Sequence, residues 1–285
     1  RLQGDWSSDV CSSDLVLSEA SARRLRASYG AKLSMIDHWL GRVFRAIEDK
    51  GLAEDTLVMV CTDHGHYLGE KDIWGKPGVP IYDTLGRIPL LVAWPGMQAR
   101  SIDALTTSVD LFATMADIFG VTARQRTHGK SLLPLIDGAA QSVRDWALMG
   151  VWGREVHITD GRWKYARAPQ AKNEPLSMMS NRWSTMPTHV LSREQELPLP
   201  DERAVLSNMP GSKVPVIKQV WDVSNQVPFW AWAKFTGHHL FDTQSDPTED
   251  NNQAGTPQEK VMADLLRHAL KQVEAPPEQF ARLGL

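Results

Sequence analysis

The sequence contains few of the residues that hold disulfide-linked or zinc-bound folds together. Its 285 residues include only two cysteines, Cys11 and Cys61, which excludes a disulfide scaffold. No CxxC motif or Cys/His cluster with the spacing of a structural zinc site occurs. A buried core must therefore hold the fold, and 42% hydrophobic residues are enough for a sizeable one.

Long apolar runs and an excess of charge of one sign are missing as well. No apolar run approaches the length of a membrane span. The formal net charge of -3 gives no global attraction to nucleic acid or acidic membranes. We therefore expect neither a membrane span nor a nucleic-acid partner.

The first 15 residues, RLQGDWSSDVCSSDL, show no periodicity and differ in style from the rest. The stretch resembles a translated sequencing adapter, and we interpret residues 1–15 as a non-native tail that takes no part in the fold. The alternative is a disordered native tail rich in Ser and Asp. On the adapter interpretation the reading frame is interrupted here, and we expect upstream sequence to be missing.

Residues 16–144 have the pattern of an α/β domain. Apolar residues at spacings of three and four predict a helix over 18–50, capped by Ser18 or Ser21 and ended by Gly51. The predicted elements that follow are buried strands over 56–62 and 88–94 and a helix over 108–119. This order indicates a mostly parallel sheet flanked by helices, with the first helix packed on it.

Residues 145–285 predict a separate, small α+β subdomain. Apolar and polar residues alternate over 146–168 around a turn at Asp160-Gly161, and a short strand follows at 239–242. Residues 170–235 look irregular, and the pattern over 257–273 predicts an amphipathic helix. We expect a small antiparallel sheet closed by that helix.

One segment, TDHGHYLGEKDIWGKP over residues 62–77, gathers the residues that carry chemistry. Asp63 and His64 directly follow a predicted strand, at the edge of an α/β sheet where ligands bind. A carboxylate oxygen and an imidazole nitrogen form half of a divalent-metal site. Lys76 lies on the same loop and can neutralise an anion on that metal, while His66 faces the site or solvent. A lone Asp-His pair is more often a simple turn. The residues around the pair therefore decide whether it is interpreted as part of a metal site.

Those surroundings resemble a known family. The segment, followed by RIPLLVAWPG, is similar to the C-terminal metal loop of the sulfatases, within the alkaline phosphatase superfamily. The stretches SYGAKLSMIDHWLGRV, SVDLFATMADIFGV, HGKSLLPLIDG, GRWKYAR and HHLFDTQSDPTEDNN resemble the helices and strands around that loop. The resemblance covers nearly all of the chain beyond the first 15 residues.

The resemblance implies a fold, an activity and a role for each matching residue. The fold is alkaline-phosphatase-like α/β, and the activity is hydrolysis of a small-molecule or carbohydrate sulfate ester. Asp63 and His64 are expected to bind a divalent metal, Ca²⁺ first and Mn²⁺ or Mg²⁺ as alternatives. Lys76 is expected to contact the sulfate and to stabilise the leaving oxygen.

The sequence departs from the family at the nucleophile. Sulfatases carry an N-terminal Asp-Asp metal pair and a Cys/Ser-x-Pro/Ala-Ser-Arg segment, whose first residue is oxidised to the formylglycine nucleophile. Neither feature occurs here: Cys11 precedes SSDL, and Cys61 precedes Thr62-Asp63 within a predicted strand. We interpret Cys61 as a small core residue and expect the chain alone to be inactive.

Two other functions remain open from the sequence. A phosphodiesterase or phosphonate monoester hydrolase of the same superfamily shares the Asp-His pair, and its substrate is also a tetrahedral anion. A non-catalytic binding protein is the alternative from another class, if the complete gene also lacks a nucleophile.

Overall fold

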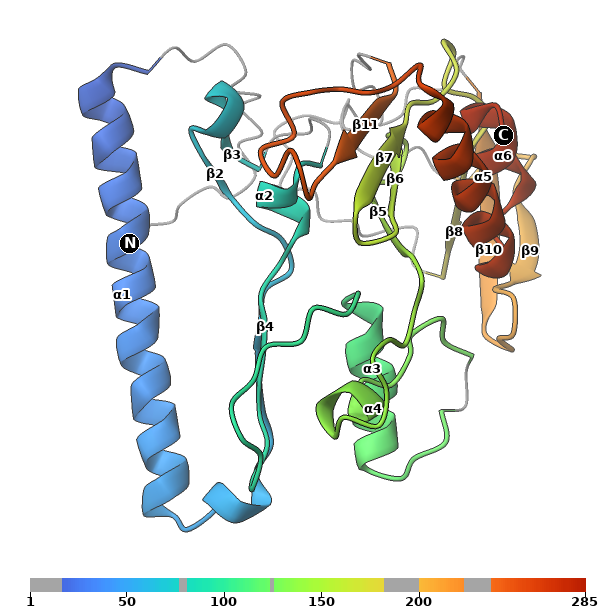
Figure 1. The fold of residues 1–285 in the computed structure, drawn as a ribbon. Helices are drawn as coiled ribbons and strands as arrows, with labels where there is room; N and C mark the ends of the chain where they lie inside the picture. The colour runs from blue at the N-terminus through green and yellow to red at the C-terminus, as the bar shows by residue number, and fades with distance from the viewer. Residues whose placement is uncertain (1–16, 77–80, 124–125, 182–199, 223–236) are drawn as a thin grey trace. The chain divides into compact units, whose positions relative to one another are not determined.

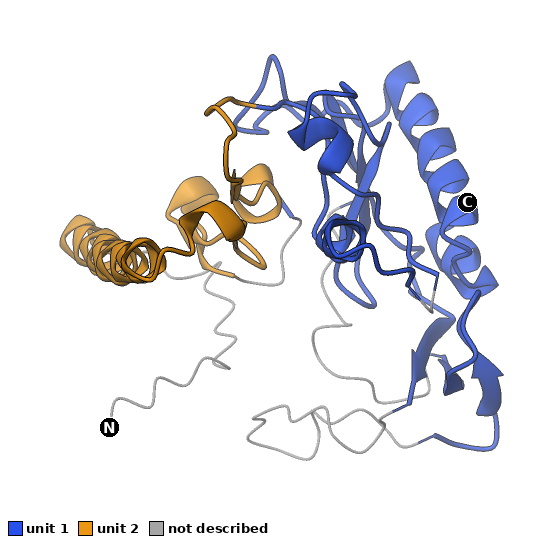
Figure 2. Ribbon diagram, turned by 90° about the horizontal axis from the view of Figure 1, so that it is seen from below, with its two compact units in different colours: residues 1–8, 79–81, 102–285 blue, residues 9–78, 82–101 orange. Residues whose placement is uncertain are grey.

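A computed structural model describes residues 17–76, 81–123, 126–181, 200–222 and 237–285 (Figure 1). The chain divides into two compact units, coloured separately in Figure 2. In the described part, unit 2 comprises residues 17–76 and 82–101, and unit 1 comprises residue 81 and residues 102–285. The predicted tail, residues 1–15, lies outside the described part, and the domain boundaries expected after residues 15 and 144 stay predictions.

The longest element of unit 2 is the helix α1, Glu19–Asp49. Its start is fixed by Ser18, whose side chain accepts a hydrogen bond from the Ser21 amide at 3.3 Å. Its end is fixed by Gly51, which adopts a positive φ of 65° that a side chain would disfavour. Both predicted ends of the helix are therefore confirmed, with Ser18 rather than Ser21 as the cap.

The predicted packing of α1 on a sheet is wrong. Five of the residues expected to face the core are exposed in the described structure: Leu25, Leu33, Ile36, Val43 and Phe44. The most extensive contact of α1 is with the two-residue strand β2, Tyr67–Leu68. An apolar stripe shows that a helix needs a partner, but it does not say which element supplies it.

Two strands of unit 2 pair as predicted, but in the opposite sense. β1, Val58–Cys61, and β4, Leu90–Ala93, form a two-stranded antiparallel sheet with Val58 opposite Ala93. A parallel pair would need a crossover that returns the chain to its starting end. Here the connection instead contains a hairpin and a short helix, and the predicted mostly parallel sheet is not what the described strands form.

The strands of this pair are also less buried than their apolar sequences predict. Residues of β1 and β4 are half-buried or exposed, and Leu91 is 65% exposed. Cys61 is an exposed free thiol, so its interpretation as a core residue is wrong. A continuous apolar run predicts cover on both faces, and no further strand joins this pair in the described part of the chain.

The connection between these strands carries the short elements that shape the loop. A 3₁₀ turn at Ala53–Asp55 precedes β1, and β2 pairs with β3, Trp74–Gly75, as an antiparallel hairpin. Residues Glu70–Asp72 form a 3₁₀ turn at the hairpin tip, and α2, Asp83–Gly86, leads into β4.

Unit 1 contains the predicted small antiparallel sheet with its closing helix. Its strand order is β11-β7-β6-β5, with all neighbours antiparallel. The strands are β5 Ala147–Gly150, β6 Val156–Thr159, β7 Trp163–Arg167 and β11 His239–Asp242. Helix α5, Pro257–Gln272, contacts β7 and β6, and α6, Pro277–Leu283, follows it.

The core of unit 1 lies between one face of this sheet and the C-terminal helices. Ile158, Tyr165 and Leu240 point from three adjacent strands onto α5, where Met262 and Leu266 are fully buried. Alternation along the strands places these side chains on one face, as the period of two requires. The predicted subdomain architecture is therefore confirmed for these elements.

A second sheet in unit 1 was not predicted. Strands β8 Leu176–Ser180, β9 Val205–Asn208 and β10 Pro215–Trp221 form an antiparallel sheet in the order β8-β10-β9. The prediction that residues 170–235 are irregular is wrong over these strands. LSMMS and PVIKQVW do not alternate cleanly, so the period of two that indicates a strand is weak there.

The segment before this sheet is organised by one buried carboxylate. Asp110 lies in α3, Val109–Ile118, and is completely buried. It accepts hydrogen bonds from the amides of Thr107 at 2.8 Å and Lys130 at 2.7 Å and forms an ion pair with Arg144. The short helix α4, Leu133–Ile136, lies between these contacts in the sequence.

No helix in the described part of the chain is both long and apolar enough to cross a membrane.

Candidate functional site

The β2–β3 hairpin brings the two ends of the chemical segment together. Asp63 and His64 lie just before β2, and Lys76 directly follows β3. Tyr67 pairs with Gly75 and Leu68 with Trp74, so the chain reverses between them. Residues 12 positions apart in the sequence therefore meet at the open end of the hairpin.

The three predicted site residues converge on one imidazole nitrogen. Lys76 Nζ donates to His64 Nε2 over 3.2 Å. Asp63 Oδ2 lies 3.5 Å from the same nitrogen, and the Asp63 Oδ1 atom accepts the His64 amide at 3.0 Å. The Asp63 and His64 side chains do not point in opposite directions, an arrangement that would have ruled out the predicted metal pair.

Hydrogen bonds define the protonation of both candidate ligands. His64 Nδ1 lies 2.7 Å from the Gly65 carbonyl oxygen, so Nδ1 carries the proton and Nε2 keeps a lone pair. A hydrogen bond from the backbone amide of Asp63 lowers the pKa of the Asp63 carboxyl. The Asp63 carboxyl oxygen and the His64 Nε2 atom face the same side.

Close packing against the chain around α2 fixes the backbone of this pair. The Gly65 amide donates to the Leu85 carbonyl at 2.9 Å. A Cβ atom on Gly65 would overlap the carbonyl oxygen of Thr84, so only glycine fits here. Thr62 contributes from the other side, because its hydroxyl donates to Asp63 Oδ1 and to the His64 carbonyl.

Two side chains of α1 that the sequence did not single out contact this loop. Tyr29 stacks on His66, with ring centroids 5.2 Å apart and an angle of 23° between the planes. Arg26 donates to the Leu68 carbonyl at 2.8 Å and lies over the Trp74 ring. Burial is the largest cause that lowers the pKa of His66. The sequence left His66 facing either the site or solvent, and the structure packs it against α1.

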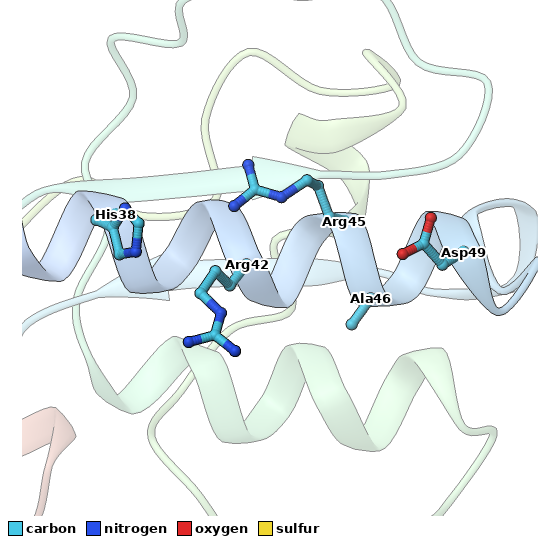
Figure 3. Close-up of a pocket in the computed structure, with 5 residues that line it drawn as sticks. All are labelled: His38, Arg42, Arg45, Ala46 and Asp49. Carbon is cyan, nitrogen blue, oxygen red and sulfur yellow. The ribbon is translucent and has the colours of Figure 1, made fainter.

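A hollow in unit 2 lies elsewhere. Its volume is about 470 Å³, and Figure 3 shows its five lining residues, His38, Arg42, Arg45, Ala46 and Asp49. All of them belong to α1, so the hollow is a furrow along one helix rather than a set of walls that converge on a ligand. It contains none of the predicted site residues.

The candidate metal pair has only two protein ligands. No group of three or more His, Cys, Asp or Glu side chains that could hold a metal ion occurs among the described residues. Asp63 is also exposed, with a side chain 83% accessible, and His64 is half-buried. Two ligands at the surface leave most coordination positions to water or to other groups, so weak metal affinity is expected.

Comparison with known proteins finds similarity over part of the chain. The Sulfatase family model matches residues 5–121, a range that contains Asp63, His64 and Lys76. Over these residues, which are less than half of the chain, the sequence is similar to the sulfatase family. This similarity agrees with the loop geometry, because the residues that resemble the sulfatase metal loop are the ones that meet in space.

Individual sulfatases share this similarity over part of their length. A choline-sulfatase of Rhizobium meliloti (strain 1021) is 30% identical over 155 residues, which are 52% of this chain and 30% of that protein. Arylsulfatase K of Gallus gallus is 30% identical over 156 residues, 50% of this chain and 29% of that protein. The chain thus matches less than one third of the length of these sulfatases.

The fold similarity extends further along the chain than the sequence similarity. A solved 2-O GAG sulfatase superposes with a TM-score of 0.59 at 18% identity, and the match covers 90% of this chain and 45% of that one. The described mixed α/β fold is therefore that of sulfatases, including the C-terminal sheets that lie beyond the family-model match.

Proposed function

We propose that this chain contributes half of the metal site and the anion-binding lysine of a sulfuric ester hydrolase. The observation that carries the proposal is the convergence of Asp63 and Lys76 on His64 Nε2, within 3.5 and 3.2 Å. A metal ligand pair next to a fixed ammonium group suits a tetrahedral anion, and the similarity of residues 5–121 to the sulfatase family supports sulfate as that anion.

The donor set of the pair fits a divalent cation. Two ligand atoms at right angles on an ion, each at about 2.3–2.6 Å from it, lie about 3.3–3.7 Å apart. The observed 3.5 Å between Asp63 Oδ2 and His64 Nε2 falls in that range. We propose Ca²⁺, with Mn²⁺ or Mg²⁺ as alternatives, because a carboxylate oxygen favours a hard cation. Such an ion would polarise the sulfate oxygens on which negative charge builds.

Lys76 acts on the anion rather than on the metal. Its ammonium group is held at the open end of the hairpin by the β2–β3 pairing, one residue beyond Gly75. From there it can donate hydrogen bonds to a sulfate oxygen or to the leaving oxygen. A preorganised donor of this kind contributes most in the transition state, where the oxygen charge is largest.

Carbohydrate sulfate esters are the substrate class that we propose. A solved structural neighbour is a 2-O GAG sulfatase, and the relatives include a choline-sulfatase and an arylsulfatase K. Small-molecule sulfate esters are the second class. The exposed position of Asp63 is compatible with either, since a bulky substituent on the ester finds no wall beside the carboxylate in the described part of unit 2.

The test uses the complete sulfatase that contains this chain. Release of sulfate from an aryl sulfate is measured for the unsubstituted protein, for Lys76→Ala and for Lys50→Ala, a matched control at the exposed end of α1. We expect turnover in the first and third proteins and a strong loss in the second. A complete protein that cleaves only phosphate diesters would move the assignment to the phosphodiesterase branch of the superfamily. Binding without turnover of either ester would favour a non-catalytic binding protein.

A further inference from the structure

The loop that carries the candidate site has little internal support. Its regular structure in the described residues is the β2–β3 hairpin, with two residues in each strand and a 3₁₀ turn at the tip. Isolated two-stranded hairpins are at best marginally stable in water. The distance between the Asp63–His64 pair and Lys76 depends on this hairpin, so something outside the loop must hold it closed.

Arg26 of α1 contacts both strands of the hairpin at one rung. Its Nε atom donates to the Leu68 carbonyl over 2.8 Å, and its guanidinium carbon lies 5.2 Å from the centroid of the Trp74 ring. Leu68 and Trp74 are partners in the register. One side chain therefore joins β2 to β3 by a charge-assisted hydrogen bond and a cation–π contact.

Gly69 shows how closely this contact is packed. Its φ is +110°, and a Cβ atom there would lie 2.6 Å from Arg26 Nη2 and 2.9 Å from Trp74 Cζ2. The hairpin turns at a residue without a side chain, and the guanidinium and the indole approach it closely. The Arg26 contact is thus built into the shape of the turn.

Tyr29 holds the other end of the loop. It lies one helical turn after Arg26, on the same side of α1. Its ring stacks on His66, two residues beyond His64, with 5.2 Å between the ring centroids. The Tyr29 contact fixes the backbone two residues beyond His64, while the Arg26 contact fixes the Leu68–Trp74 rung, one rung further from Lys76 than the Tyr67–Gly75 rung. Figure 1 shows α1 beside this hairpin.

We infer that Arg26 and Tyr29 are positioning residues that hold Asp63, His64 and Lys76 at the spacing needed to bind a divalent cation and its anion. The inference rests on the proposed function for the metal, but the contacts that carry it lie outside the three site residues. Replacement of a residue that orients a metal ligand lowers metal affinity roughly 10–100-fold. We expect that range for loss of either brace.

The experiment measures Tb³⁺ binding by the 285-residue chain carrying Leu33→Lys and Val43→Lys, which interrupt the exposed apolar stripe of α1. Tb³⁺ occupies Ca²⁺ sites, and its luminescence is sensitised by nearby tryptophan such as Trp74. The part of the Tb³⁺ luminescence that is lost in Asp63→Asn is assigned to the proposed metal site. Arg26→Ala and Tyr29→Ala are expected to weaken this binding roughly 10–100-fold. Tyr29→Phe keeps the ring and restores most of the affinity. Arg24→Ala is the matched control, since this arginine points to another side of α1.

Amide hydrogen exchange over residues 65–75 gives a second measurement that needs no metal. Arg26→Ala and Tyr29→Ala should speed amide exchange in this loop. The control substitution Arg24→Ala should leave the exchange rates unchanged. Unaltered exchange and unaltered Tb³⁺ affinity in both alanine variants would overturn the brace. Absence of Tb³⁺ binding in the chain with Arg26 and Tyr29 intact, with faster exchange in the variants, would instead remove the metal site and leave a structural clamp only.

Discussion

Lys76 and Asp63 approach the same imidazole nitrogen, but their loss should have different consequences. In the complete protein, Lys76→Ala is expected to lower turnover by roughly two to three orders of magnitude, the usual effect of removing one preorganised donor to a developing negative charge. Asp63→Ala should act through loss of the metal, so excess Ca²⁺ should partly restore turnover. The measurement is kcat against added Ca²⁺ for both variants. Equal recovery of both would assign Lys76 to metal binding instead.

Asp242 makes unit 1 sensitive to acid. Hydrogen bonds from Arg162, with Nη2 at 2.7 Å from Oδ2, lower the pKa of the Asp242 carboxyl to about 2. A folded pKa below the unfolded value of about 3.9 stabilises the fold above that pH, and this stabilisation is lost as the pH falls towards 2. We expect the melting temperature to fall between about pH 4 and pH 2, and to fall less steeply in Asp242→Asn.

The matched control for this pH dependence is Asp117→Asn, because Asp117 is exposed on α3. Its melting temperature should follow that of the unsubstituted chain at every pH. If Asp242→Asn shows the same slope as the control, the carboxyl is not the group that titrates.

The candidate site residues could be grouped from the sequence, whereas the residues that support them could not. Asp63, His64 and Lys76 share one loop, so a motif of 16 letters shows them together. Arg26 and Tyr29 lie on α1, about 40 positions from their partners in the loop, and as an arginine and a tyrosine on a long helix they look like ordinary surface residues. Such contacts depend on which turn of a helix meets a loop, and local spacing does not encode that.

At the scale of elements, ends were easier to predict than pairings. Ser18 and Gly51 fixed the ends of α1 through the local chemistry of caps, which needs only a few neighbouring residues. The sense of the β1–β4 pair depends on the whole connection between the strands, and an apolar run carries no direction. The sheet of β8, β9 and β10 was not predicted for a related reason. The burial of its residues depends on neighbouring elements, and the strand sequences do not alternate clearly between apolar and polar residues.

Helix α5 should be the element on which the stability of unit 1 depends most. Leu266 is completely buried against the sheet, whereas Val261 on the same helix is 56% exposed. Leu266→Ala should therefore lower the free energy of unfolding by about 2–5 kcal/mol through lost burial and a residual cavity. Val261→Ala, the matched control, should change it by less than about 0.5 kcal/mol. Urea denaturation followed by circular dichroism measures both, and similar losses would place the core elsewhere.

For the whole molecule, the exposed apolar face of α1 predicts poor behaviour in solution. Leu33, Ile36, Trp39 and Val43 are each about half exposed, at 51%, 49%, 53% and 53%. A contiguous apolar stripe of this kind promotes association. We expect the 285-residue chain to aggregate or to elute as large species in size-exclusion chromatography with light scattering.

The double variant Leu33→Lys/Val43→Lys should raise the monomeric fraction, because it interrupts the stripe without touching the loop contacts of α1. A matched pair of substitutions on the opposite side, Arg24→Lys and Arg45→Lys, should not. A monodisperse, cooperatively unfolding product from the unsubstituted chain would show that this face is covered in solution.

A further prediction concerns whether this chain is catalytic by itself. No Cys/Ser-x-Pro/Ala-Ser-Arg segment occurs in the sequence, so we expect no sulfate release from an aryl sulfate by this chain alone. Turnover by the purified 285-residue chain, abolished by Lys76→Ala, would mean that a different nucleophile acts here.

The contacts of the buried Asp110 carboxylate should hold the chain together after cleavage of the backbone by a protease. The carboxylate holds the amide of Lys130 and the guanidinium of Arg144 from α3, and Thr114 one turn later accepts the amide of Leu132 at 2.9 Å. A single protease nick between Gly120 and Gly129 would sever the backbone but leave these contacts in place. The two fragments should then migrate as one species on a native gel and separate only in denaturant, because the non-covalent contacts of Asp110 and Thr114 keep them associated.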